Sequence, residues 1–414
     1  MAGLDKKKPE HMPITSFPVR DGELTVGGIK ISQLANRVGS TPFYAYDRGL
    51  ITERFQTLRD HMPADLKLHY AMKANPMPAV VQHMSRLVDG LDLASAGEMM
   101  TALDTGMAPD LISFAGPGKT EQELSQAIAA GVVINMESPL EMENIARIAK
   151  QQGVPAKVAI RVNPDFELKA SGMKMGGGPK QFGVDAEAVP EMLSRLAELG
   201  LDFIGFHIYS GSQNLSVESL LDTQEKTLEL AVRLTEAAPH APRKVNIGGG
   251  LGIPYFPGDK PLDLKVLGAG LKNLMADFHK QLPDTEVVME LGRFMVGEAG
   301  LYVTKIVDKK VSRGEIYLIA DGGMHHHLAA SGNFGQMIRK NYPVAIGNRM
   351  DSSEKEQANV VGCLCTPLDR LGDKMLLPAA EVGDFVVLFQ SGAYGLSASP
   401  TAFLGHAEPA EVLV

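Results

Sequence analysis

The sequence predicts an α/β chain that consists of a (β/α)8 barrel and a smaller β domain. Two observations carry this prediction. Strand-like and helix-like runs alternate eight times over roughly 250 residues, which is the element arithmetic of such a barrel. After about residue 298 the helical runs cease, and strand-like runs follow one another between Gly, Pro and Asp breaks.

The predicted barrel strands are short runs rich in apolar residues, and the segments between them carry helical periodicity. A doubly wound sheet is the alternative, but it would need a nucleotide-binding fingerprint after its first strand, and the chain has none there. The strands are predicted at Leu66–Tyr70, Gly90–Leu93, Ile112–Phe114, Val132–Ile134, Lys157–Val162, Phe203–His207, Lys244–Ile247 and Glu286–Glu290. The helices are predicted at Arg48–Met62, Pro78–Leu87, Glu98–Thr105, Glu121–Ala130, Pro139–Gln152, Ala188–Gly200, Val217–Ala238 and Leu262–Gln281.

Strand-like runs also occur near both ends of the chain. Glu23–Val26 and Gly28–Ile31 precede the barrel and have no place in it, so we expect them to join the C-terminal β domain. The predicted domains are therefore residues 46–297 for the barrel, and residues 1–45 with 298–414 for the β domain. The C-terminal strands are predicted at Tyr302–Val307, Glu315–Ala320, Asn359–Leu364 and Asp384–Phe389.

The composition excludes several classes of function. The 414 residues are 44% hydrophobic and carry a net charge of −9, so no basic surplus favours nucleic acid or an anionic membrane. No apolar run approaches a membrane span, and the first residues lack the apolar segment of a signal peptide. Two cysteines, Cys363 and Cys365, are too few for a disulfide scaffold or a four-thiolate metal site. We expect a cytoplasmic protein.

Lys73 stands where the first barrel strand gives way to a turn, inside His69–Asn75. Chemistry in such barrels gathers at the C-terminal ends of the strands. We expect apolar neighbours to keep the amine poorly hydrated, which favours its neutral form. A neutral lysine amine can form a Schiff base with an aldehyde. A lone lysine near a loop is more often a surface residue, so the downstream residues decide.

Further polar residues occupy the ends of other predicted strands. A triple glycine lets backbone N–H groups approach an anion closely, as phosphate sites require, and barrels commonly bind phosphate near their last strands. A strand-end amine beside a phosphate site indicates pyridoxal 5'-phosphate, which is an aldehyde with a phosphate group. These strand-end residues are Asp92, Arg161, Asn163, His207, Ser210, Gly248, Gly249, Gly250, Glu290 and Arg293.

Several motifs of this chain, in the order in which they occur along it, resemble those of the fold-type III pyridoxal-phosphate decarboxylases. That family includes diaminopimelate, ornithine and arginine decarboxylases. The resemblance extends over nearly the whole chain, and it implies an alanine racemase-like barrel with a C-terminal β domain. The motifs are Tyr70–Asn75, Phe206–Ile208, Gly248–Gly250, Glu290–Arg293, Gly392–Gly395 and the ending Pro409–Val414.

The resemblance implies a role for each residue around the cofactor ring. Lys73 would hold the cofactor covalently, and Asp92 would lie near Lys73 and orient it. Glu290 would keep the pyridine nitrogen protonated, so that the ring accepts charge as the carboxylate leaves. His207 would stack on the ring face as a further catalytic residue; without the motif, a core histidine is the simpler interpretation.

The resemblance also assigns the phosphate and substrate sides. Ser210, the glycine run and Tyr394 would bind the phosphate, and Arg293 would contact phosphate or substrate. Cys365 matches a family cysteine that comes from the partner subunit and protonates the carbanion after CO2 leaves. The alternative is a small buried apolar residue, for which Cys363 is the better candidate. This assignment implies an obligate homodimer with shared active sites.

The predicted contacts to the far end of the substrate depart from diaminopimelate decarboxylases. Those enzymes carry an acidic residue directly after the cysteine, where this chain has Thr366, and an arginine where it has Ala329. A buried charge without its partner is costly, so Thr366 and Ala329 predict altered specificity. The predicted substrate-binding residues are Arg293, Cys365, Thr366 and Tyr394. The glycine-rich, cationic Gly172–Gly183 suits a loop near an anionic substrate. The pattern resembles decarboxylases of amino acids tethered to an acyl carrier protein, and the exosortase-associated branch.

Three other functions stay open: a diaminopimelate decarboxylase of lysine biosynthesis, an amino acid racemase that uses the same cofactor, and a non-catalytic cofactor-binding protein. A racemase would need a second base on the opposite face, and the contexts of Cys365 and Gly392–Gly395 favour decarboxylation. Non-catalytic relatives lack the β domain, whereas the match continues to Val414. The run His325–His327 suggests a metal at first sight, but adjacent side chains diverge, and no metal is predicted.

Overall fold

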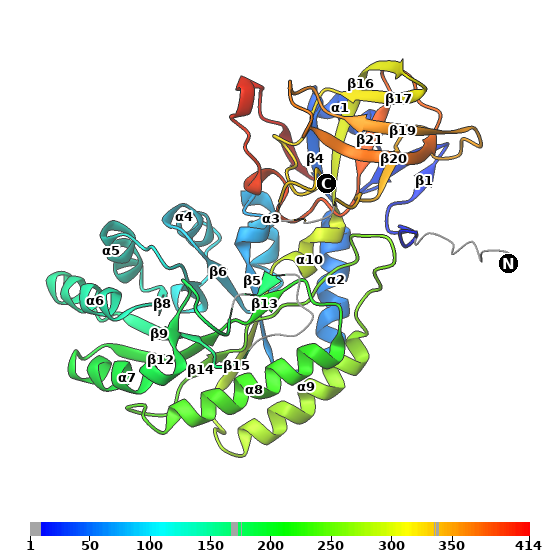
Figure 1. Ribbon diagram of the computed structural model, residues 1–414. Helices are drawn as coiled ribbons and strands as arrows, with labels where there is room; N and C mark the ends of the chain where they lie inside the picture. Colours follow the sequence, from blue (N-terminus) through cyan, green and yellow to red (C-terminus); the bar gives the residue numbers. More distant parts are fainter. Residues whose placement is uncertain (1–9, 167–172, 175, 335, 337–338) are drawn as a thin grey trace. The chain divides into compact units, whose positions relative to one another are not determined.

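The computed structural model describes residues 10–166, 173–174, 176–334, 336 and 339–414 (Figure 1). The chain divides into two compact units. One unit is Arg54–Ile253 with Pro261–Met295. The other combines the chain before Arg54 with Pro254–Lys260 and Val296–Val414. Among the residues so described, no helix is both long enough and apolar enough to cross a membrane.

The first unit is a closed barrel of parallel strands. Its eight strands follow the order β9-β12-β14-β15-β5-β6-β7-β8, and pairing of β8 with β9 closes the ring. All eight predicted strands are confirmed, with ends shifted by at most two residues. They are β5 (Lys67–Ala71), β6 (Gly90–Leu93), β7 (Ile112–Phe114), β8 (Val133–Met136), β9 (Lys157–Asn163), β12 (Asp202–Ile208), β14 (Lys244–Asn246) and β15 (Glu286–Leu291). The short β11 (Val184–Asp185) adds to β9, and β10 (Met173–Lys174) pairs with β13 (Gly211–Ser212).

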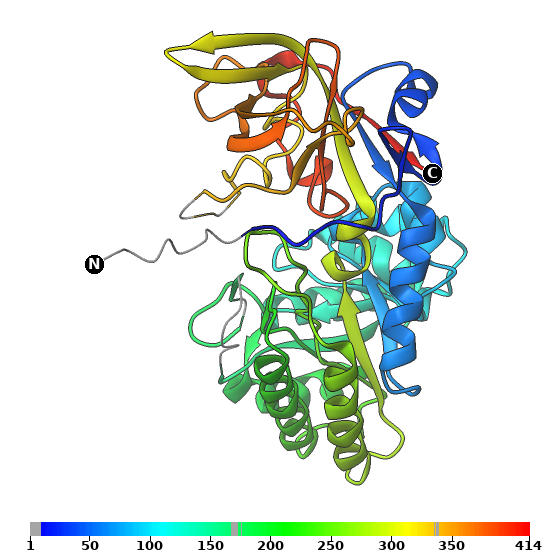
Figure 2. The same ribbon diagram turned by 90° about the vertical axis from the view of Figure 1, so that its right-hand side faces the viewer.

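Helices follow the barrel strands and lie around the outside of the barrel (Figure 1). Side-chain caps fix where several begin, because they satisfy backbone N–H groups that have no intrahelical acceptor. Thr120 and Glu123 form a capping box at α5, and Ser138 caps α6. Figure 2 shows the two long helices α8 and α9 side by side, in green and yellow-green. The helices are α2 (Arg48–His61), α3 (Pro78–Met84), α4 (Ala96–Leu103), α5 (Glu121–Ala130), α6 (Pro139–Gln152), α7 (Val189–Glu198), α8 (Val217–Thr235), α9 (Leu264–His279) and α10 (Arg293–Val296).

The second unit is built mainly from strands. Its sheet runs β18-β21-β16-β17-β19-β20, with β4 beside β16 and β22 beside β4. The strands are β4 (Phe43–Tyr46), β16 (Gly300–Ser312), β17 (Glu315–Ala320), β18 (Val344–Ile346), β19 (Lys355–Val361), β20 (Arg370–Pro378), β21 (Phe385–Leu388) and β22 (Ala410–Leu413). A small sheet of β1 (Val19–Arg20), β2 (Glu23–Val26) and β3 (Ile29–Lys30) precedes α1 (Ile31–Val38).

One hydrophobic core joins the two ends of the chain within this unit. Leu24 and Val26 of β2 and Phe43 of β4 are buried together with Val303 of β16 and Val387 of β21. These side chains are fully or almost fully removed from water, which stabilises the fold by roughly 25 cal/mol for each Å² of apolar surface buried. The prediction that the N-terminal strands complete the β domain is therefore confirmed.

Candidate active site

Lys73 lies on a 3-10 turn, Met72–Ala74, that directly follows β5. Met72 and Ala74 are buried and anchor the turn, while the Lys73 side chain is exposed. The amine lies 5.7 Å from the ring centroid of Tyr209. The prediction of a poorly hydrated amine is therefore wrong for the chain as described. The physical reason is that β5 ends at Ala71, so Lys73 projects beyond the packed strand instead of from within it.

Glu290 and His207 form a buried pair at the ends of β15 and β12. His207 Nε2 lies 3.0 Å from Glu290 Oε2, and both side chains are less than a tenth exposed. Asn246 donates to the same carboxylate oxygen at 3.1 Å. Burial alone would raise the pKa of Glu290, but the charges of His207, Lys73 and Arg161 outweigh it and hold the pKa below its usual value. Glu290 is thus a buried carboxylate that stays ionised.

The glycine run Gly248–Gly250 packs against the ends of β12 and β15. A Cβ on Gly249 would lie 1.9 Å from the Glu290 carbonyl oxygen, so no larger residue fits there. Gly248 and Gly250 have φ of +67° and +82°, which favours glycine. The Asn246 side chain accepts from the amide of Gly248 at 2.8 Å. This local geometry explains why three glycines follow β14.

The site also holds donors that the protein itself leaves unused. Ser210 Oγ is buried, and it has no hydrogen-bond partner among the described residues. The backbone amides of Gly249 and Gly250 likewise donate to no acceptor among the residues that the structure describes. Buried polar groups are rarely left unpaired. Two backbone N–H groups and a hydroxyl on adjacent loops have the chemistry of an anion cradle, so these residues fit a phosphate group.

Arg293 and Asp92 flank the Lys73 turn in different ways. Arg293 begins α10 directly after β15, and its neighbour Gly292 approaches the turn so closely that a Cβ there would lie 2.8 Å from Ala74 Cβ. Asp92 faces the barrel interior. Its Oδ1 accepts from Ser113 Oγ at 2.6 Å and lies 3.2 Å from His69 Nδ1. Among described residues Asp92 makes no ion pair with Lys73, so its orienting role stays a prediction.

Arg161 on β9 forms a second buried ion pair. Its Nη1 lies 2.8 Å from Glu137 Oε1, and both side chains are less than a tenth exposed. The guanidinium also lies 4.8 Å from the Phe182 ring centroid, and Glu137 accepts from the amides of Gly116 and Gly183. The pair therefore ties three loops at the strand ends together.

We expect Arg161→Ala to destabilise the fold by about 3–5 kcal/mol, because it leaves Glu137 as an uncompensated buried charge. Urea unfolding of the variant and of the unchanged protein measures this difference. The matched control is Arg195→Ala, which removes an exposed arginine from its pair with Glu143 and should leave the unfolding midpoint nearly unchanged. Equal midpoints for the two variants would contradict the assignment.

The remaining predicted site residues belong to the other unit. Cys365 is exposed and Thr366 is half-buried, and they lie on a turn that Asp369 organises by accepting from the amide of Leu364 at 2.9 Å. Tyr394 is half-buried and has a left-handed backbone, with φ of +52°. Non-glycine residues with this backbone conformation are uncommon, and strained residues cluster at active sites.

Some predicted features are left undecided by the structure. Ala329 is buried, and its place at the far end of the substrate stays a prediction. The loop predicted at Gly172–Gly183 lies in part outside the described residues.

Sequence reasoning missed three residues of the site. Asn246 holds Glu290, Glu137 holds Arg161, and Tyr209 lies near the Lys73 amine. Glu137 and Tyr209 come directly after β8 and β12, and Asn246 ends β14. The rule that polar residues at strand ends carry the chemistry would have found all three.

Comparisons with known proteins agree with this geometry. Residues 48–297 match the family model of the pyridoxal-dependent decarboxylase, pyridoxal binding domain. The chain is 37% identical to the L-glutamyl-[BtrI acyl-carrier protein] decarboxylase of Niallia circulans, over 93% of this chain and 91% of that protein. It is 33% identical to the diaminopimelate decarboxylase of Aquifex aeolicus, over 98% of this chain and 93% of that one.

A solved structure shares the whole architecture. The diaminopimelate decarboxylase of M. jannaschii, in co-complex with L-lysine, superposes with a TM-score of 0.88 at 26% identity, covering 97% of this chain and 93% of that chain. The predicted decarboxylase family and its cofactor, pyridoxal 5'-phosphate, are thereby confirmed. This chain belongs to the pyridoxal-dependent decarboxylases, and it is a carboxy-lyase that removes the α-carboxylate of an amino acid.

Proposed function

We propose that the amino acid decarboxylated by this chain is carried on an acyl carrier protein. The observation that carries the proposal is the pair of uncharged residues, Thr366 and Ala329, where the resemblance to diaminopimelate decarboxylases calls for an acid and an arginine. A free diaminopimelate would bring an ammonium and a carboxylate to these positions without partners, which is costly. The 37% identical relative is named for a carrier-linked glutamyl substrate, which also supports a carrier-linked substrate for this chain.

Within the barrel unit we propose that Lys73 holds the cofactor, and that Ser210 and the glycine run bind its phosphate. The unused hydroxyl and amides described above support the phosphate assignment. Bound pyridoxal phosphate supplies an electron sink for the charge that develops when the carboxylate leaves. Glu290 keeps a negative charge in the site, and His207 would lie against the cofactor ring. Arg293 would contact the phosphate or the substrate, and Asp92 would lie near Lys73 and orient it.

We propose that the β-rich unit contributes the substrate side. Cys365 delivers a proton to the substrate carbon after CO2 leaves, and Thr366 and Tyr394 contact substrate or phosphate. The exposure of Cys365 supports a homodimer in which this thiol enters the partner's active site. Both cysteines are free thiols, which supports a reducing, cytoplasmic location.

The proposal is tested with holoenzyme and a panel of substrates. Free glutamate, free diaminopimelate and glutamyl carrier protein are each incubated with the enzyme, and CO2 and product mass are measured. We expect kcat/KM for the carrier-linked substrate to exceed that for either free amino acid by at least about tenfold. Rapid decarboxylation of free diaminopimelate, with no turnover of a carrier-linked amino acid, would sink the proposal and favour diaminopimelate decarboxylase.

A substitution at the far end of the substrate sharpens the test. We expect Thr366→Glu to raise kcat/KM for free diaminopimelate, because a carboxylate there can pair with the distal ammonium. The matched control is Thr366→Gln, because glutamine has nearly the size of glutamate but no charge. We expect this variant to show no rise in kcat/KM for free diaminopimelate. If both variants behave alike, Thr366 does not face the substrate's distal amine.

A further inference from the structure

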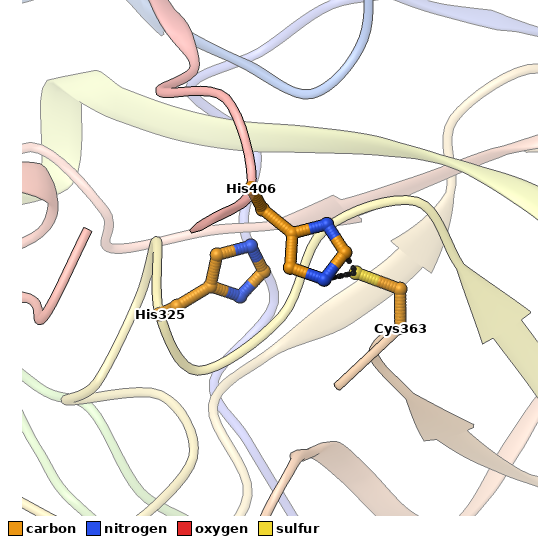
Figure 3. A group of neighbouring side chains, drawn as sticks. All are labelled: His325, Cys363 and His406. Atoms are coloured by element: carbon orange, nitrogen blue, oxygen red, sulfur yellow. Dashed lines mark hydrogen bonds between the residues drawn. The ribbon is translucent and has the colours of Figure 1, made fainter. Parts of the chain in front are cut away.

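Three metal-binding side chains converge in the β-rich unit (Figure 3). His325 comes from the turn after β17, Cys363 from the loop after β19, and His406 from the segment after a short 3-10 turn, Phe403–Gly405. One ligand atom from each residue lies within 4.8 Å of the other two. Cys363 Sγ is 3.9 Å from His406 Nδ1, and the rings of His325 and His406 are 5.1 Å apart. Segments separated by about forty residues each thus bring one imidazole or thiol to a single point.

Among the described residues, His325 is the only member of the histidine run that has no hydrogen-bond partner. Its side chain is fully buried, and neither ring nitrogen makes a hydrogen bond there. His326 contacts the Ala407 carbonyl and the Tyr302 hydroxyl, and His327 contacts Ser391 and the amide of Ala330. An unpaired buried polar group costs free energy. A ligand bound to a ring nitrogen of His325 would remove this cost. His326 and His327 already have hydrogen-bond partners and need no such ligand.

Asp369 fixes the backbone on both sides of the cluster. Its carboxylate accepts from the amide of Met324, next to His325, at 2.6 Å. Its other oxygen accepts from the amide of Leu364, next to Cys363, at 2.9 Å. The backbone beside buried His325 and half-buried Cys363 is therefore held in place before any ion arrives, which is how outer contacts orient metal ligands.

The electrostatics of the cluster suit a cation. The carboxylates of Asp369 and Asp321 lie near the Cys363 thiol. The same negative charges attract a cation, and an arriving metal displaces the thiol proton.

We propose that His325, Cys363 and His406 bind a zinc ion, with a fourth position open to water or an external ligand. One thiolate and two imidazoles are a ligand set that zinc favours. Tetrahedral zinc, with Zn–N of about 2.0–2.1 Å and Zn–S of about 2.3 Å, needs donor atoms about 3.3–3.7 Å apart. The observed separations are at most 4.8 Å and exceed this range by at most about 1.5 Å, which rotation of the exposed His406 side chain can close.

This proposal departs from the sequence-based expectation that the chain binds no metal. The rings of His325 and His326 lie 3.6 Å apart, but the histidine run supplies one ligand to the cluster and not three. The site does not depend on the proposed substrate, because its ligands are three side chains of this chain.

The experiment uses full-length holoenzyme, stripped with a chelator and then dialysed against zinc. Metal analysis is expected to find about one tightly held zinc per chain, and zinc-edge X-ray absorption a sulfur at about 2.3 Å with nitrogens at about 2.0–2.1 Å. Cys363→Ser should lose the sulfur contribution, and the exposed His406→Gln should bind zinc at least about tenfold more weakly. X-ray absorption is chosen because the cofactor does not contribute to it.

Matched controls separate this site from other thiols and histidines. Cys365→Ser removes the neighbouring thiol, and His240→Gln removes an exposed histidine of the barrel; both should keep zinc and its sulfur contact. The proposal is overturned if the unchanged protein takes up no zinc after dialysis. It is equally overturned if Cys363→Ser retains the sulfur contact, or if folded His406→Gln, checked by circular dichroism, binds zinc as tightly as the unchanged protein.

Discussion

Replacing Lys73 with alanine is expected to lower kcat by at least about 10³-fold on any amino acid substrate. Lys73 lies on the turn after β5, beside the end of β15, where its charge reaches Glu290. Without its amine the chain has no covalent hold on the cofactor aldehyde at this place. CO2 release under saturating cofactor measures the loss. Borohydride reduction followed by peptide mass spectrometry should place the cofactor on Lys73 in the unchanged protein.

The matched control for this prediction is Lys67→Ala. Lys67 is at the opposite end of the same strand, β5, and it is half-buried. Its loss removes a lysine from the same element without touching the strand end, so kcat should stay within about twofold. A Lys73→Ala enzyme that turned over as fast as Lys67→Ala would remove the basis for every role proposed around the cofactor.

The barrel was predictable because its signal is local and repeated. Each strand is a short apolar run, and each helix shows a period that a strand cannot share. The ends of the elements were harder to predict, because caps decide them. Ala96–Leu103 begins two residues before the helix predicted at Glu98, since Ser95 caps the helix by accepting from the amide of Glu98.

The site was predictable in its residue types but not in its contacts. Lys73, Glu290 and the glycine run come from motifs, whereas the support that Asn246 gives to Glu290 joins β14 to β15 over 44 positions. Such a contact follows from strand register, which single-sequence patterns do not fix. The exposure of Lys73 depends equally on where β5 ends.

The convergence of His325, Cys363 and His406 had no sequence signal at all. The spacings between these residues match no compact metal motif, and the visible feature, His325–His327, pointed to the wrong grouping. The pairing of β4 with both β16 and β22 brings the two chain ends together in this unit. The turns that carry His325 and Cys363 meet because β17 and β19 pair in parallel, and only the folded chain displays this.

Replacing Glu290 with glutamine is expected to lower kcat by about 10²-fold or more, with little loss of bound cofactor. The carboxylate is buried, receives a hydrogen bond from Asn246 and lies 3.0 Å from His207 Nε2. Glutamine keeps the shape and removes the negative charge that would hold the cofactor's ring nitrogen protonated. Steady-state kinetics and cofactor titration together measure the effect. Glu286→Gln, on the exposed start of β15, is the matched control and should behave like the unchanged enzyme.

The same substitution changes how stability depends on pH. The folded-state pKa of Glu290 is below its ordinary value of 4.5, because His207, Lys73 and Arg161 stabilise the carboxylate against its burial. A lowered pKa contributes stability that is present above the ordinary value and is lost as pH falls below it. Urea unfolding of Glu290→Gln should therefore vary less with pH between about 5 and 3 than that of Glu286→Gln. One outcome of the kinetic experiment would contradict the catalytic role of Glu290. If Glu290→Gln lost its cofactor while any remaining holoenzyme kept full kcat, the carboxylate would be a structural group and not an electronic partner of the ring.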